Sequence, residues 1–216
     1  MKALLFGALA EGQGYPRIRT LTGALESLGV ELARLTRPLD RRSQGRARRS
    51  PAGALIQAAR LFAARGALLR AGRALHRPDL VLVGHPAQAA ADLPGRIWPG
   101  VPVVVDLFLS AYDTVVVDRR LVPERSLRAS WLRRLDRRAA RAGSLVLVDT
   151  PQMGLFAAGL TGLPPARFRT FPCGDPDAPA SPAPYLPPRP GEPLRALYVG
   201  TGVPLHGLEQ LLDAVR

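Results

Sequence analysis

The sequence predicts an α/β fold, a Rossmann-like doubly wound parallel sheet with helices on both faces. Several short runs consist almost entirely of valine and leucine, which is typical of strands buried on both sides of a parallel sheet. These runs alternate with segments of helical periodicity, the order expected of βαβ units. A proline-rich stretch then separates this pattern from a last strand-turn-helix signal. We therefore expect one α/β domain over residues 1–172, a stiff interdomain linker over 173–193, and a truncated second Rossmann-like domain over 194–216.

The first half of the pattern starts with a strand, a glycine-containing turn and a helix. Ile18, Leu21, Leu25 and Leu28 recur at helical spacing, and Gly29 follows as a stop. A basic stretch at 36–50 has no apolar period, and a long Ala/Leu/Arg helix follows it. The predicted elements are strands at 2–7, 30–35 and 79–84 and helices at 16–28 and 51–75.

The second half continues the alternation up to the linker. We expect strands at 101–107, 144–149 and 168–171 and helices at 122–142 and 152–160, which makes a parallel sheet of six or seven strands. On helix 122–142, Trp131, Leu135, Ala139 and Ala142 are predicted to form the buried face. Beyond the linker, a strand at 194–199, a glycine turn and a helix at 206–216 read as the opening of the second domain.

Composition limits the classes of function. The formal net charge is +13, which favours nucleic acid or anionic membrane as a partner. However, Lys2 is the only lysine, and the excess of Arg, Ala, Gly and Pro indicates codon bias, which weakens that argument. The single cysteine, Cys173, excludes an intrachain disulfide. No apolar run reaches the ~18 residues of a membrane span, and we expect a cytoplasmic location, with the inner membrane face as an alternative.

The candidate site residues lie where strands end. Gly12 and Gly14 follow the first strand, where glycines let a backbone approach a phosphate or sugar; a turn that merely needs glycine is an equal alternative. Asp106 ends a strand, and there a carboxylate can bind sugar hydroxyls or act as a base. His85 follows another strand end, where it could contact a ligand; a partly exposed structural histidine is at least as good an interpretation. Asp149 is interpreted instead as part of a helix start, with Thr150.

Other signals are absent or weak. No dinucleotide fingerprint, Walker loop, nucleophile elbow or metal-ligand spacing of Cys and His occurs, so no metal or nicotinamide cofactor is expected. His206 and Gly207 begin the last helix, where an imidazole could meet a phosphate. The helix 122–142 carries arginines that could bind anionic lipid, although a solvated face is the preferred interpretation, and no aromatic platform for nucleic acid accompanies them. These arginines are Arg128, Arg133, Arg134, Arg137, Arg138 and Arg141.

Four segments, taken in order, resemble one family. They read VVVDLFLSAYDT from 103, RRLDRRAARAGSLVLVDT from 133, FPCGD from 171 and YVGTGVPLHGLE from 198. Together they resemble a GT-B glycosyltransferase of the retaining, family 4-like group, over nearly the whole chain. The resemblance implies an N-terminal acceptor-side domain and the start of a donor-binding domain. The glutamate pair of the family's E-x7-E element does not occur in these 216 residues, so this chain alone is expected to be inactive.

The resemblance also implies roles for particular residues. Asp106 would lie near the reacting sugar, and Gly12 and Gly14 would face the diphosphate or the acceptor. Gly202, His206 and Gly207 would lie near the donor phosphates, although many members carry Arg and Lys in this segment. The implied function is transfer of a sugar from a nucleotide-diphosphate donor to a hydroxyl acceptor, without metal or other cofactor. Two alternatives remain open: a sugar-nucleotide epimerase of the same fold, and a basic module that binds membrane or nucleic acid.

Overall fold

The structure is a computed structural model that describes residues 1–9, 16–38, 51–174, 191–193, 197–198 and 207–215. Its centre is a six-stranded sheet, and every pair of neighbouring strands is parallel. The order across the sheet is β2-β1-β3-β4-β5-β6. The strands are β1 (Lys2–Leu9), β2 (Glu31–Pro38), β3 (Leu80–Val83), β4 (Val103–Phe108), β5 (Leu145–Val148) and β6 (Phe168–Thr170). The predicted doubly wound parallel sheet is confirmed.

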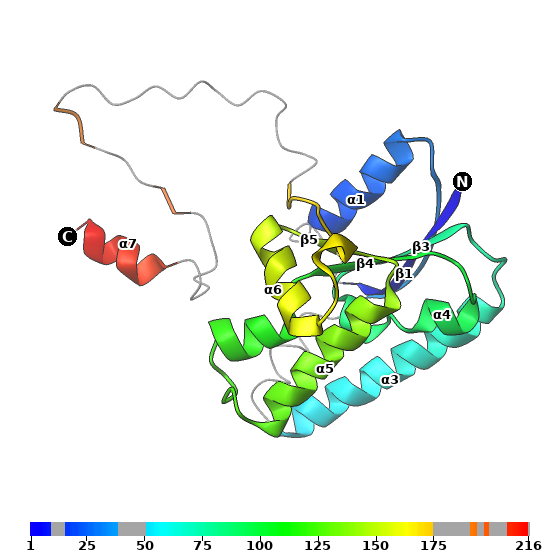
Figure 1. Cartoon of the computed structure of the whole chain (residues 1–216), viewed down its shortest axis with the longest axis horizontal. Helices are drawn as coiled ribbons and strands as arrows, with labels where there is room; N and C mark the ends of the chain where they lie inside the picture. Colours follow the sequence, from blue (N-terminus) through cyan, green and yellow to red (C-terminus); the bar gives the residue numbers. More distant parts are fainter. Residues whose placement is uncertain (10–15, 39–50, 175–190, 194–196, 199–206, 216) are drawn as a thin grey trace.

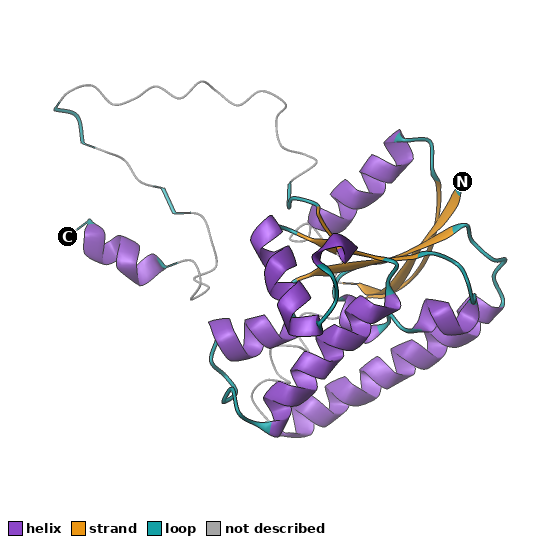
Figure 2. Cartoon of the chain, in the orientation of Figure 1, coloured by secondary structure: helices purple, strands orange, loops and turns teal. Residues whose placement is uncertain are grey.

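Helices cover both faces of the sheet, as Figures 1 and 2 show. On one face, α1 (Pro16–Ser27) packs Leu21 against Leu5, Leu9 and Leu82. The larger apolar cluster fills the other face, beneath α3 (Pro51–Arg73), α4 (Leu93–Ile97), α5 (Leu127–Ala142) and α6 (Pro151–Thr161). The sequence analysis did not predict α4, which is too short and too rich in proline and glycine to show a period.

Local sequence explains where two of the covering helices begin and end. Ser126 caps α5, because its hydroxyl accepts a hydrogen bond from the Ala129 N–H at 3.1 Å. Thr150 caps α6 in the same way through Met153, and Pro151 occupies the first turn. Gly162 ends α6 with a positive φ of 69°, a conformation that suits glycine. Asp149–Thr150 therefore does begin a helix, as interpreted from the sequence.

The segment between β4 and α5 differs from the prediction. We expected one helix from 122 to 142, but α5 begins at Leu127, and a π-helical turn, η2 (Asp113–Asp118), precedes it. The buried face of α5 is only partly the predicted one, because Ala139 is buried as expected but Trp131 is 58% exposed. The α5 side chains that are buried are those of Ala129, Leu132, Asp136, Ala139 and Ala140. Apolar periodicity failed here because a carboxylate is buried and a tryptophan is not.

Beyond the linker, the structure describes only short pieces. The predicted strand 194–199 lies mostly outside the described residues, and so do Gly202 and His206. The last helix, α7 (Leu208–Ala214), lies within the predicted range. Gly207 precedes it with a positive φ of 62°, which explains why glycine stands there. The division into two domains and a linker stays a prediction.

Candidate functional site at the carboxyl edge of the sheet

The strand order places a ligand-binding crevice at a definite point. The chain moves outward from β1 to β2 in one direction, and from β1 to β3 and onward in the other. Open α/β sheets bind ligands at such a reversal, beside the carboxyl ends of the strands. Here β1 ends at Leu9, and β3 ends at Val83, followed by Gly84 and His85. The glycines predicted for this edge, Gly12 and Gly14, lie outside the described residues.

A buried ion pair between Arg17 and Asp106 lies next to this edge, in the interior of the domain. Arg17, in the first turn of α1, donates to both carboxylate oxygens of Asp106 on β4. Its Nε lies 2.9 Å from Oδ1 and 3.0 Å from Oδ2, and its Nη2 lies 2.8 Å from Oδ1. Arg17 also donates to the carbonyl oxygen of Phe171. One guanidinium thus joins α1, the central strand β4 and the chain just after β6.

Neither member of this pair reaches the surface. The side chain of Asp106 is 0% exposed and that of Arg17 is 4% exposed. Burial raises the pKa of Asp106 above its ordinary value, while the hydrogen bonds and charge of Arg17 favour the ionised form. The sequence analysis predicted that Asp106 lies at an open edge. In the structure its carboxylate is buried beneath that edge and hydrogen-bonded to Arg17.

Two aromatic rings hold the guanidinium in place. Arg17 lies 4.7 Å from the ring centroid of Phe108 and 5.3 Å from that of Phe171, both within cation–π range. Phe108 has a positive φ of 49°, and the pairing of β4 with β5 shifts register between Asp106 and Phe108. This bulge turns the Phe108 ring toward Arg17 and His85. Bulges of this kind commonly re-aim a side chain next to a site.

His85 is a polar side chain at this edge, directly after β3. Its ring meets Phe108 edge-on, with centroids 5.2 Å apart. Its Nδ1 lies 3.3 Å from the carbonyl oxygen of Leu107, and since a carbonyl only accepts, Nδ1 carries the proton. Burial lowers the pKa of His85 from 6.5 to about 4; the hydrogen bond to Leu107 opposes this, and the charge of Arg17 adds to it. At neutral pH the imidazole is uncharged, and its Nε2 is a hydrogen-bond acceptor.

A second buried carboxylate fixes the backbone that follows β4. Asp136 on α5 accepts hydrogen bonds from the N–H groups of Ala111 at 3.0 Å and Tyr112 at 2.9 Å. It also accepts from Ser110 Oγ at 2.7 Å and from Gln88 Nε2 at 3.0 Å. Asp136 thereby supplies acceptors to N–H groups at the start of the helical segment that leads into η2. The sequence analysis missed it, because a lone aspartate among arginines looks like a surface residue.

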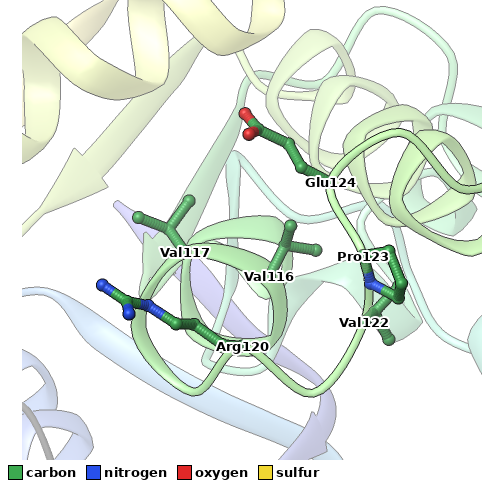
Figure 3. A pocket seen from close by; sticks show the side chains of 6 residues that line it. All are labelled: Val116, Val117, Arg120, Val122, Pro123 and Glu124. Carbon is green, nitrogen blue, oxygen red and sulfur yellow. The ribbon is translucent and has the colours of Figure 1, made fainter.

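A hollow of about 470 Å³ lies beside η2. Figure 3 shows its side chains around the turn that joins η2 to the start of α5. Its walls are mostly apolar, with one cation and one carboxylate. The lining residues are Val116, Val117, Arg120, Val122, Pro123 and Glu124.

Two kinds of feature are absent from the residues that the structure describes. No group of three or more His, Cys, Asp or Glu side chains among them could hold a metal ion. None of the helices in the described part is both long and apolar enough to cross a membrane.

Comparison with protein families identifies the domain. A family model described as a glycosyl transferase 4-like domain matches residues 14–174, about three quarters of the chain. The chain belongs to this glycosyltransferase family. The match spans every helix and strand from α1 to β6, including Arg17, His85 and Asp106. A search of curated proteins finds no match. The resemblance drawn from the sequence is therefore confirmed at the level of the family and of its α/β fold.

Within this glycosyltransferase domain, the structure brings some of the predicted residues together. His85 and Asp106 are connected indirectly: Phe108 contacts the ring of His85 and also the guanidinium of Arg17, which is the partner of Asp106. Arg17 is the participant that sequence reasoning missed. Its signal was its place in the first turn of a helix directly after the glycine segment, although a charged helix residue is ordinarily exposed.

Proposed function

We propose that this domain is the acceptor-side half of a glycosyltransferase that moves a sugar from a nucleotide-diphosphate donor to a hydroxyl group. In such a reaction the bond between the anomeric carbon and a phosphate oxygen breaks, and the anomeric carbon bonds to the acceptor oxygen. The proton of the acceptor hydroxyl passes to the departing diphosphate or to water. The observation that carries the proposal is His85: a neutral imidazole at the strand reversal of a glycosyltransferase 4-like domain.

His85 binds a sugar hydroxyl in this proposal. With Nδ1–H committed to Leu107, its Nε2 accepts a hydrogen bond from a hydroxyl donor. Because the pKa of His85 is about 4, the ring keeps this acceptor function throughout the neutral range. Asp106, predicted from the sequence to be catalytic, is better suited to a positioning role. Its carboxylate is occupied by Arg17, which in turn supports the Phe108 ring beneath His85.

We propose that the nucleotide-sugar donor binds at the other residues predicted from the sequence. Gly12 and Gly14 follow β1 and would approach the donor diphosphate or the acceptor with their backbone. Gly202, His206 and Gly207 would lie near the donor phosphates. Backbone N–H groups can hold a diphosphate without a metal ion, and no metal is part of the proposal.

Ligand-observed saturation-transfer NMR on the 216-residue chain tests this function. The probes are a panel of simple glycosides and UDP-, GDP- and ADP-sugars. We expect glycosides to give saturable signals, and His85→Phe to abolish them while keeping an aromatic ring against Phe108. His76→Ala, at an exposed histidine after α3, is the matched control and should change nothing. Signals from no sugar of any kind, or equal signals from the His85 variant, would refute the proposal.

Assays of the same samples address the remaining alternatives. We expect no release of nucleotide diphosphate by this chain alone, because transition-state stabilisation by a GT-B enzyme needs both halves of its cleft. Conversion of one nucleotide sugar into its epimer, without an acceptor, would favour the epimerase alternative.

A further inference from the structure

The face of α5 that points away from the sheet is unusual. Leu127 is 91% exposed and Trp131 is 58% exposed, one helical turn apart on the same side. Leu121, in the turn before α5, is 59% exposed. Its neighbour Val122 packs in one apolar cluster with Ala129 and Leu132, which keeps Leu121 near the first turns of α5. Monomeric soluble proteins rarely expose several large apolar side chains next to one another unless that surface binds a partner.

Arginines accompany these apolar side chains. Arg134 continues the stripe of Leu127 and Trp131 at helical spacing, and Arg128 stands in the first turn; both are exposed. The segment 119–141 has only two acidic residues, Glu124 and Asp136, and Asp136 is fully buried. Its arginines are Arg119, Arg120, Arg125, Arg128, Arg133, Arg134, Arg137, Arg138 and Arg141. We call Leu121, Leu127, Arg128, Trp131 and Arg134 the α5 surface.

The position of this surface follows from the topology. In right-handed βαβ units the helix runs back antiparallel to the strand, so its N-terminal end lies toward the carboxyl edge of the sheet. Leu127 and Trp131 are in the N-terminal half of α5 and therefore lie toward the edge that holds His85. Arg65 on α3 and Arg138 on α5 both bind Asp92, which places the two helices side by side. Figure 1 shows their N-terminal ends at one end of the domain.

We propose that the α5 surface docks on an anionic lipid bilayer. A tryptophan beside a leucine matches the interfacial zone of a membrane, where an indole ring lies among the headgroups and an aliphatic chain among the upper acyl segments. The arginines face the negative surface potential at the same time. Nucleic acid would use the arginines but would leave Leu127 and Trp131 in water. Docking also directs the carboxyl edge of the sheet toward molecules held in the membrane.

The exposure of Trp131 changes how the arginines of α5 are interpreted. Arginines alone could be a solvated face, and the sequence analysis preferred that interpretation because arginine is abundant throughout the chain. It separately predicted that Trp131 lies on the buried face of the helix. The structure buries Trp98, at 6% exposed, and leaves Trp131 at the surface. The exposed apolar side chains lie close to exposed arginines, so burial of apolar area and attraction to anionic headgroups can act together.

Vesicle binding by the whole chain tests the proposal. Co-sedimentation is measured with vesicles of phosphatidylcholine alone and of phosphatidylcholine mixed with phosphatidylglycerol. We expect binding that needs the anionic lipid, falls with added salt, and drops about tenfold or more in Leu127→Ser with Trp131→Ser. The double variant Arg128→Gln with Arg134→Gln should weaken vesicle binding more at low salt than at high salt. These variants change exposed side chains, and circular dichroism checks that they fold.

Matched controls are available at exposed positions elsewhere. Leu28→Ser, at a 78% exposed leucine beyond α1, and Arg73→Gln, at the far end of α3, should bind like the parent chain. Brominated lipid should quench Trp131 emission and spare that of buried Trp98. No binding to any vesicle, or equal losses in the controls, would overturn the proposal. DNA binding without vesicle binding, or self-association lost in the Leu127 and Trp131 variant, would also overturn it, in favour of nucleic acid or a protein partner. None of these readouts depends on sugar transfer.

Discussion

Replacing Arg17 with methionine should destabilise the domain strongly, because it leaves a carboxylate without a partner in the interior. The Asp106 side chain is 0% exposed, and among the residues that the structure describes its side-chain hydrogen bonds are the three contacts with Arg17 at 2.8–3.0 Å. Breaking a buried pair by removing one partner costs about 3–5 kcal/mol. We therefore expect the free energy of unfolding to fall by about that amount at pH 7, measured by urea denaturation.

The loss should depend on pH in a definite direction. Burial raises the pKa of Asp106, and without Arg17 nothing opposes that effect. A carboxyl group whose folded-state pKa lies above its unfolded value destabilises the fold as pH rises through the unfolded value. The Arg17→Met variant should thus approach the parent's stability in acid and diverge from it toward neutral pH.

The double variant Arg17→Met with Asp106→Leu separates an ion-pair effect from a packing effect. Replacing both charges with apolar groups of similar size is often neutral or stabilising, so we expect it to recover more than about half of the single-variant loss. A single-variant loss below about 1 kcal/mol, or no recovery in the double variant, would refute the argument that Asp106 depends on Arg17.

Three further predictions follow from single contacts. His85, with a pKa lowered to about 4, is neutral when folded, so stability should fall as pH drops from 6.5 toward 4, and His85→Gln should flatten that part of the urea-derived pH profile. Asp136→Ala removes a buried acceptor of four hydrogen bonds and should lower the free energy of unfolding by about 3 kcal/mol or more; a loss within error in urea denaturation would contradict its role. Gly84→Ala places a methyl group 2.7 Å from two side chains and should lower the free energy of unfolding by about 1–3 kcal/mol. Gly23→Ala, in open space within α1, should raise it by about 0.5–1 kcal/mol. Thermal melts that rank the two variants in reverse would contradict the packing argument.

The sheet was predictable because burial on both faces leaves a direct mark on sequence. The runs that became β3, β4 and β5 contain little besides Val and Leu, and their observed ends lie within two residues of the predicted ones. The family resemblance drew on several of the same segments. Short elements carried no such mark: α4 has five residues, and η2 holds a Val-Val-Val run that favours a strand by composition.

The site was only partly predictable, for a physical reason. Strand ends indicated the segments that hold His85 and Asp106, whose roles stay predictions, but sequence patterns cannot show that the charged side chain of Asp106 is buried against its partner. Arg17 is separated from Asp106 by 89 positions, and Asp136 lies among arginines. Periodicity counts apolar residues as inside and charged ones as outside, so it misplaced Trp131 and gave no sign that Asp136 is buried. Gly12, Gly14, Gly202 and His206 lie outside the described residues and stay predictions.

Histidine-selective NMR of the intact chain tests the central claim most directly, that the carboxyl edge beside His85 binds a sugar. The chain carries three histidines, and His85 is the one at the strand reversal. Titration with a glycoside that gives a saturation-transfer signal should shift the His85 imidazole resonances saturably, with Nδ1 protonated throughout, and leave His76 unchanged. Saturable binding that leaves the His85 resonances unchanged, or that shifts those of His76, would place the sugar elsewhere and contradict the account.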